Sequence, residues 1–192
     1  MKKILLTSLL AVFAVSGAQA ANYFVGGGAS LNMDETHSNV MGIGTEVGWK
    51  YTDAWDLGLG VNLGYERTDA DNGMYGYGVD VFARYKIAEF GNFKVLLKGA
   101  VSADFETRVS EIEAIDGETT SSLGFSVAPM VTYDVSEAFT LYANLNFLGI
   151  NAGYTFENET LGTPDGWKFS AFANSADVAN TGAFQIGFLY NF

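Results

Sequence analysis

The sequence predicts an all-β fold, a transmembrane antiparallel up-and-down β-barrel of eight strands that follows a cleavable signal peptide. Three observations predict it: segments of alternating polar and apolar residues recur, aromatic residues lie at the ends of the apolar faces, and the chain ends on one such segment. Side chains of a strand point alternately to its two faces, so each segment has one apolar face. If these faces meet lipid, only a closed barrel of strands pairs every backbone polar group.

The first twenty residues are typical of a secretory signal. Two lysines precede an apolar run at residues 4–15, which is too short to cross a bilayer as a helix, and a small-residue cleavage site ends at Ala20. We therefore expect residues 1–20 to be removed and residues 21–192 to form one outer-membrane β-barrel domain. The alternative interpretation of this segment is a membrane anchor or a buried helix.

Composition excludes several classes of function. The chain has no cysteine, so no disulfide framework and no thiolate metal site is available. Its formal net charge of −12 makes it a poor candidate for nucleic-acid binding, which needs a basic patch. After the signal there is no run of about 18 apolar residues, so no transmembrane helix is expected. Only strands could then carry the chain across a membrane.

The segment 55–66 shows the clearest alternation. Its apolar face carries Trp55, Leu57, Leu59, Val61, Leu63 and Tyr65. A tilted membrane strand needs about 9–11 residues, so the segment is long enough. Aromatic residues stand at both ends of this face, where a ring can lie at each lipid–water interface.

Seven other segments show the same alternation. They are residues 23–31, 41–51, 75–87, 93–105, 123–133, 139–147 and 184–192. Pro129 cannot donate a hydrogen bond to a ladder, which predicts a bulge or local bend there. Residues 148–181 are less clear: they extend the last hairpin of an eight-stranded barrel, or they hold two more strands of a ten-stranded one.

The connections alternate in length, with short turns on one side and longer loops on the other, as in outer-membrane barrels whose turns are periplasmic. An even strand number places both termini at the turn side. The outward aromatic residues of that side would form a girdle of Tyr23, Trp49, Trp55, Tyr85, Phe93, Tyr133 and Phe139, together with Tyr190 and Phe192.

A soluble lipocalin-like barrel is the rival fold, because its apolar face points inward instead. The polar faces are rich in glycine, which suits the narrow bore of about eight strands. A solvent-facing surface would carry more lysine and glutamate. The banded aromatic residues and the aromatic terminus also favour the membrane barrel.

The final residues FQIGFLYNF, with Phe188, Tyr190 and Phe192 on the apolar face, resemble the C-terminal insertion signal of bacterial outer-membrane barrels. With the signal sequence and the alternating segments, the chain resembles the small OmpA/OmpX-like outer-membrane barrels. The resemblance implies a porin-like protein of the Gram-negative cell envelope, with lipid bilayer, lipopolysaccharide and the barrel-assembly machinery as partners. Unlike full-length OmpA-type proteins, the sequence ends with the barrel, so a peptidoglycan-tethering role is not implied.

The polar faces would line the bore with charges of both signs. Because buried charges must be paired, we expect a lumenal charge network centred on Glu46, Asp80, Arg84 and Lys98. This network would plug the bore and hold the strand register. The alternative interpretation is a gate that exchanges ion-pair partners to open a small pore.

No catalytic, cofactor-binding or metal-binding residue is assigned, and the protein is not expected to be an enzyme. His37 is the only histidine and lies in a predicted outer loop, where a solvated role is the simpler interpretation. The glycines at 26–28 are followed by neither a lysine nor a helix-forming segment, so they do not predict a phosphate loop. Acidic outer loops are interpreted as solvated, and divalent cations are the alternative ligand.

We therefore expect a structural and surface-interaction protein whose outer loops meet extracellular or host-surface molecules. The first alternative function is a narrow channel for small solutes. The second is an outer-membrane lipid-modifying enzyme that would use His37.

Overall fold

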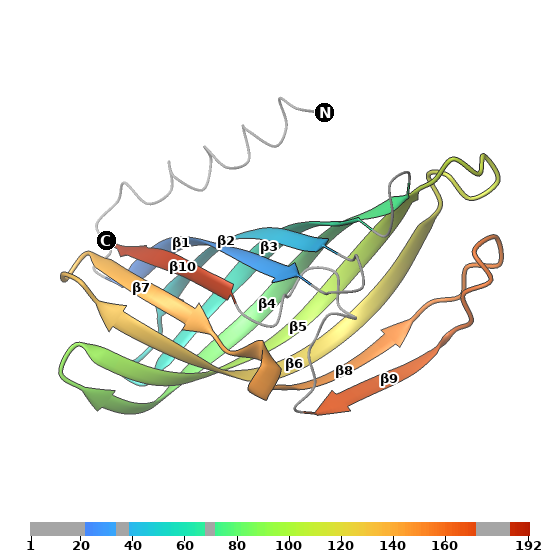
Figure 1. Ribbon diagram of the computed structural model, residues 1–192. Coiled ribbons are helices and arrows are strands. Elements are labelled where there is room, and N and C mark those ends of the chain that lie inside the picture. The colour runs from blue at the N-terminus through green and yellow to red at the C-terminus, as the bar shows by residue number, and fades with distance from the viewer. Residues whose placement is uncertain (1–21, 34–38, 68–71, 172–184) are drawn as a thin grey trace.

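The computed structural model describes residues 22–33, 39–67, 72–171 and 185–192 (Figure 1). The expected signal peptide at residues 1–20 lies outside these residues, as do His37 and Phe184. The strands are β1 Tyr23–Met33, β2 Asn39–Lys50, β3 Trp55–Arg67, β4 Gly73–Phe90, β5 Phe93–Val109, β6 Thr119–Asp134, β7 Phe139–Asn144, β8 Ile150–Thr155, β9 Gly166–Ala171 and β10 Gln185–Asn191. A short 3₁₀ turn, η1 Asn146–Leu148, follows β7.

Eight of these strands close into an antiparallel barrel in the order β1–β2–β3–β4–β5–β6–β7–β10, with β10 pairing back to β1. This confirms the predicted fold class and strand number. The remaining pair, β8 and β9, is a hairpin that extends the wall from β6 (Figure 1). The two short strands of the alternative interpretation therefore exist, but they do not enlarge the closed ring.

The predicted C-terminal limit of the strand at 139–147 is wrong, because β7 ends at Asn144. The cause lies on the neighbouring strand β6, where Pro129 has no N–H to offer the ladder. Leu145 N still donates to Pro129 O at 2.9 Å, and the chain then turns through η1. Pairing with β6 resumes only at β8. The predicted irregularity at Pro129 thus appears as a break in its partner strand.

The outward surface of the barrel is a belt of exposed apolar side chains. At the turn end, cross-strand aromatic pairs ring the barrel: Trp55 and Tyr85 have ring centroids 4.8 Å apart, and Phe93 and Tyr133 have centroids 4.7 Å apart. Tyr23 and Trp49 also pair in register and are exposed. Such a band matches the interface of a bilayer, where amphipathic rings are most stable.

Phe139 is less exposed than the other residues of the expected girdle. Its ring stacks on that of Phe188 with centroids 5.7 Å apart. The girdle expected from alternation is therefore outward-facing, and this one member is partly covered by a neighbour on β10.

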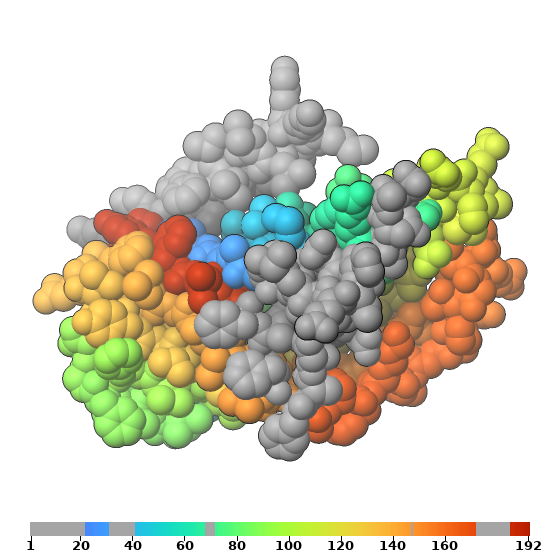
Figure 2. All heavy atoms as spheres, in the orientation of Figure 1, coloured from blue at the N-terminus to red at the C-terminus, as the bar shows by residue number. Residues whose placement is uncertain are grey.

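The connections at the two ends of the barrel differ in length. Short turns join β2 to β3, β4 to β5 and β6 to β7. At the other end, the 110–118 loop and the β8–β9 hairpin project beyond the remaining wall (Figure 2). In the described part of the chain, no helix is long and apolar enough to cross a membrane.

Candidate functional site

The inward-facing glycines make room in the bore for larger side chains of neighbouring strands. A Cβ on Gly58 would lie 2.4 Å from Phe82 Cζ, and a Cβ on Gly60 would lie 2.4 Å from Asp80 Oδ1. Glycine is required at these positions because any side chain would occupy the space that the neighbour fills. The glycines of the inward face therefore leave the space that larger side chains of neighbouring strands occupy in the bore.

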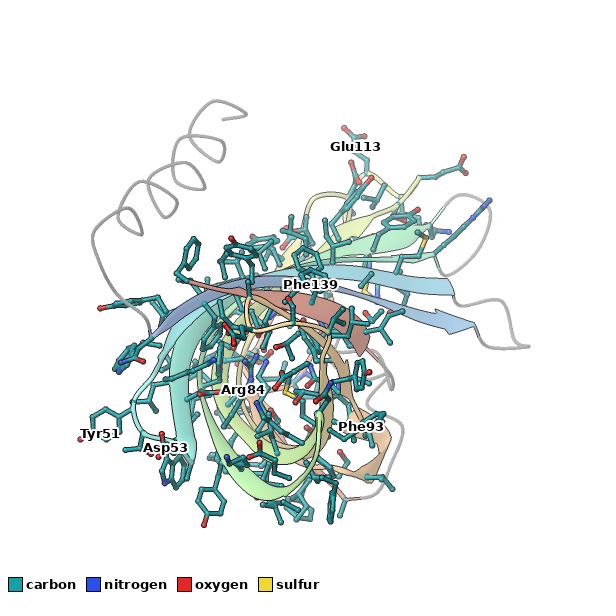
Figure 3. All side chains as sticks on the ribbon, turned by 90° about the vertical axis from the view of Figure 1, so that its left-hand side faces the viewer. Tyr51, Asp53, Arg84, Phe93, Glu113 and Phe139 are labelled. Atoms are coloured by element: carbon teal, nitrogen blue, oxygen red, sulfur yellow. The ribbon has the colours of Figure 1, made fainter. Side chains whose placement is uncertain are left out.

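An ion pair stands at the centre of the bore. Arg84 on β4 donates to Glu46 on β2, and Lys98 on β5 places its Nζ 3.8 Å from the other carboxylate oxygen of Glu46. The Arg84 side chain is fully buried, at 0% exposure, and lies inside the ring of strands, whereas Phe93 lies outside it (Figure 3). Two cations thus share one carboxylate: Arg84 is fully buried, whereas the Lys98 side chain is partly exposed.

Three aromatic rings surround the Arg84 guanidinium. Its Cζ lies 4.5 Å from the ring centroid of Phe82, 5.2 Å from that of Phe24 and 6.0 Å from that of Tyr142. Nε and Nη1 have no hydrogen-bond acceptor among the described residues. Ring faces attract a guanidinium electrostatically, so the aromatic cage stabilises the part of the cation that Glu46 does not reach.

Around the ion pair, the lumen contains an apolar cluster that the sequence reasoning missed. Its buried members are Phe24, Phe82, Leu96, Met130, Tyr142 and Leu189. The sequence does contain a sign of this cluster, because the alternation fails locally. Phe82 stands between Val81 and Ala83, so three apolar residues occur in a row. A large apolar residue on the inward face must pack against something within the bore.

Asp80 lies near this network but has a different partner. Asn62 Nδ2 donates to Asp80 Oδ1 at 2.7 Å, while Asp80 Oδ2 has no hydrogen-bond partner among the described residues. The structure therefore brings together Glu46, Arg84 and Lys98, and places Asp80 on the outer side of that group.

A second polar group closes the turn end of the bore. Lys94 Nζ lies 2.5 Å from Asp134 Oδ2, and Thr140 Oγ1 donates to Asp134 Oδ1 at 2.7 Å. Asn191 Nδ2 donates in turn to Thr140 Oγ1 at 3.3 Å. Although burial opposes ionisation, the hydrogen bonds from Lys94 and Thr140 hold the pKa of the Asp134 carboxyl below its usual range. This group joins β5, β6, β7 and β10.

The alternative sites fall mostly outside the described residues. His37 and its acidic neighbours Asp34 and Glu35 lie in the undescribed segment 34–38. Among the residues that the structure does describe, no three Asp, Glu or His side chains converge as a metal site. Among the described residues, the charged and aromatic side chains of the bore are therefore the candidate site.

A closed antiparallel barrel with an outward apolar belt, aromatic rings at one end of that belt and charged side chains in its lumen has the architecture of a transmembrane β-barrel. The structure is similar to the crystal structure of Neisserial surface protein A (NspA), with a TM-score of 0.56 and 15% sequence identity over 90% of this chain and 98% of that one. This likeness confirms the predicted fold.

Two further solved structures align over nearly the whole chain. A major outer membrane protein from Thermus thermophilus has a TM-score of 0.48 at 14% identity, over 91% of this chain and 100% of that one. The N-terminal β-barrel domain of Pseudomonas aeruginosa OprF has a TM-score of 0.47 at 12% identity, over 90% of this chain and 98% of that one. No protein-family model and no curated protein sequence matches the chain.

Proposed function

We propose that this protein is a closed, non-enzymatic outer-membrane barrel with a structural and surface-interaction role, in which the lumen is plugged and the outer hairpins contact envelope or host-surface molecules. The observation that carries the proposal is the burial of Arg84 at the centre of the bore. A fully buried guanidinium surrounded by three aromatic rings and an apolar cluster supports a plug that leaves no water path at this level of the bore.

The outer hairpins supply a surface large and ordered enough to bind a partner. In the 110–118 loop, Ser110 N donates to Asp116 Oδ1 at 3.1 Å, and Gly117 takes the left-handed φ of 78° that closes the turn. Asn158, in the β8–β9 hairpin, donates from Nδ2 to Thr119 O at 3.0 Å and to Glu118 Oε2 at 3.3 Å. Two loops distant in sequence are thereby joined into one surface.

This joined surface combines negative charge with exposed apolar side chains. Its acidic residues are Glu111, Glu113, Asp116, Glu118, Glu157, Glu159 and Asp165. Ile112, Phe156 and Trp167 are exposed on the same hairpins. Exposed apolar groups rimmed by charges favour protein contact, and carboxylates together with divalent cations favour contact with lipopolysaccharide phosphates.

The surface role is tested by replacing residues 110–118 with a short glycine–asparagine turn in the full chain. We expect normal barrel assembly but weaker cell adhesion, or weaker resistance of the envelope to detergent. The matched control replaces the turn at residues 135–138, which lies at the opposite end. If neither adhesion nor envelope integrity changes, the surface role is wrong.

The plug is tested by planar-bilayer recording of the purified barrel. We expect no steady conductance from the wild-type protein, since the Arg84 region closes the bore. Large, steady openings would instead favour the narrow channel and would contradict the plug.

A further inference from the structure

Above the Arg84 plug, the bore widens into a cavity of about 540 Å³ that we call the outer vestibule. It extends from Asp80 and Lys98 at mid-bore to Thr163 and Lys168 on the β8–β9 hairpin. Its size falls in the range of sites for small molecules. Its inner part, from Asp80 to Gln185, is distinct from the loop surface proposed above, whereas its outer rim is shared with the β8–β9 hairpin.

Two carboxylates lie on one wall of the vestibule. Asp80 on β4 is opposite Ser102 on β5, and Asp104 is two residues further along β5, where it is opposite Gly78. A Cβ on Gly78 would lie 2.2 Å from Asp104 Oδ1, so the glycine makes the space in which this carboxylate rests. Ser102 Oγ donates to Asp104 Oδ2 at 2.5 Å. The wall is therefore built around two buried acids that are held in place.

An arc of amide side chains continues from Asp80 around the bore. Asn62 Nδ2 donates to Asp80 Oδ1, and across the bore Asn144 Nδ2 donates to Gln185 Oε1, each at 2.7 Å. The two halves meet above Gly44, where a Cβ would lie 2.6 Å from Asn62 Oδ1 and 3.1 Å from Gln185 Nε2. The four side chains thus form one polar arc that lines the vestibule.

Both ends of this arc carry an acceptor without a donor. Asp80 Oδ2 and Asn144 Oδ1 have no hydrogen-bond partner among the described residues, although the two side chains are only 8% and 3% exposed. Buried acceptors in native proteins almost always receive a hydrogen bond, and an unsatisfied one costs about 1–3 kcal/mol. The two ends of the arc therefore each lack a donor, although other residues of the vestibule wall, such as Arg108 and Lys168, carry donor groups.

Lys98 does not supply the missing donor. Its Nζ lies 3.8 Å from Glu46 and 4.6 Å from the ring centroid of Phe82, on the plug side of the vestibule. A tightly bound divalent cation also fits poorly, because no three acidic or histidine side chains of the described residues converge. A protonated amine meets the requirement, since an ammonium brings a positive charge and three donors.

We propose that the outer vestibule binds a small protonated amine, whose ammonium donates to Asp80 Oδ2 at one end of the arc and whose other polar end donates to Asn144 Oδ1. The Asp80 carboxylate attracts the positive charge of the amine. The Asn144 amide oxygen accepts a hydrogen bond and so orients the bound molecule. The hydroxyls and amides above it, including those of Ser126, Asn151 and Thr155, accommodate the polar remainder of the solute.

The test is calorimetric titration of the full, detergent-solubilised barrel with putrescine, and with butanediol as a neutral probe of the same length. We expect saturable binding of putrescine and none of butanediol. Asp80→Asn keeps the shape but removes the charge, and we expect it to weaken binding at least about tenfold. Glu137→Gln, in the exposed turn at the opposite end of the barrel, is the matched control for loss of one carboxylate and should leave affinity unchanged.

A second variant changes affinity in the opposite direction. Asn144→Asp adds a carboxylate at the far end of the arc and should tighten putrescine binding about tenfold or more. This variant decides the question if Asp80→Asn fails to assemble, which heat-modifiable gel mobility would reveal. Equal binding of putrescine and butanediol, no binding by wild type, or no change in Asn144→Asp would overturn the proposal.

Discussion

Arg84 on β4 and Glu46 on β2 form an ion pair at the centre of the barrel, although their strands are separated by β3. On β3, the inward glycines Gly58 and Gly60 leave space for side chains of β4: a Cβ on Gly58 would lie 2.4 Å from Phe82 Cζ, and a Cβ on Gly60 would lie 2.4 Å from Asp80 Oδ1. Gly58 thereby makes room for Phe82, whose ring centroid lies 4.5 Å from Arg84 Cζ. Glycine placement on β3 and the packing around the buried cation are therefore linked.

Breaking this ion pair from one side should destabilise the barrel strongly. Glu46→Gln leaves the buried Arg84 without its ion-pair partner, and loss of one partner of a buried pair costs about 3–5 kcal/mol. We expect a clear fall in the urea midpoint of unfolding in lipid vesicles. Replacing both residues, as in Glu46→Met with Arg84→Met, should cost less, because the buried guanidinium is removed with its partner and only the partly exposed Lys98 loses the Glu46 carboxylate.

The control for that experiment is an ion pair outside the bore. Lys86 Nζ lies 2.5 Å from Glu89 Oε2 at the exposed turn end, where water screens the charges. Glu89→Gln should leave the urea midpoint unchanged. Equal effects of Glu46→Gln and Glu89→Gln would show that burial of the central pair has no energetic role.

A side chain at Gly187 on β10 should prevent normal packing of the barrel. A Cβ there would lie 2.3 Å from Gly27 O and 2.5 Å from Tyr142 Cζ, so backbone and plug would both have to shift. Overpacking of this kind costs about 1–3 kcal/mol or more. We expect Gly187→Val to lower the heat-modifiable fraction, whereas Gly166→Val, with no atom within 4 Å of the added Cβ, should not.

The turn-end group should make stability depend on pH. The pKa of Asp134 is lowered in the folded barrel, so its stabilising contribution is complete above the ordinary carboxyl pKa and is lost as pH falls through the lowered folded value. We expect the unfolding midpoint to fall on acidification in wild type. The fall should be smaller in Asp134→Asn, which has already lost the charge.

Glu137 provides the comparison for this measurement, because it is an exposed carboxylate in the same turn. Glu137→Gln should retain the wild-type pH profile. A pH profile unaltered by Asp134→Asn would remove this residue as the source of the dependence.

The aromatic end of β10 should direct assembly. Phe188, Tyr190 and Phe192 are exposed on the outward face, where the barrel-assembly machinery and lipid could both reach them. We expect the triple alanine variant to accumulate unassembled in cells, measured as loss of heat-modifiable protein. Alanine at Trp167 and Phe169, which are exposed on β9, is the control; equal loss in both would argue against a terminal signal.

The repeated two-residue alternation of the sequence determined the barrel. Apolar segments that are too short to cross a membrane as helices can pair all their backbone N–H and C=O groups in lipid only as strands of a closed sheet. It also separated inward from outward residues, which is why Glu46, Arg84 and Lys98 could be assigned to the bore. Alternation assigns a face but not a height or a cross-bore neighbour. It therefore could not predict that Asp80 accepts a hydrogen bond from Asn62.

Tertiary structure alone decided how the bore is filled. The aromatic cage of Phe24, Phe82 and Tyr142 comes from three strands that are distant in sequence, and only barrel closure brings their rings around Arg84. The break after Asn144 likewise depends on Pro129 of the adjacent strand. Local pattern thus determined which face each residue takes, and long-range register determined which residues meet, because register is a property of paired strands.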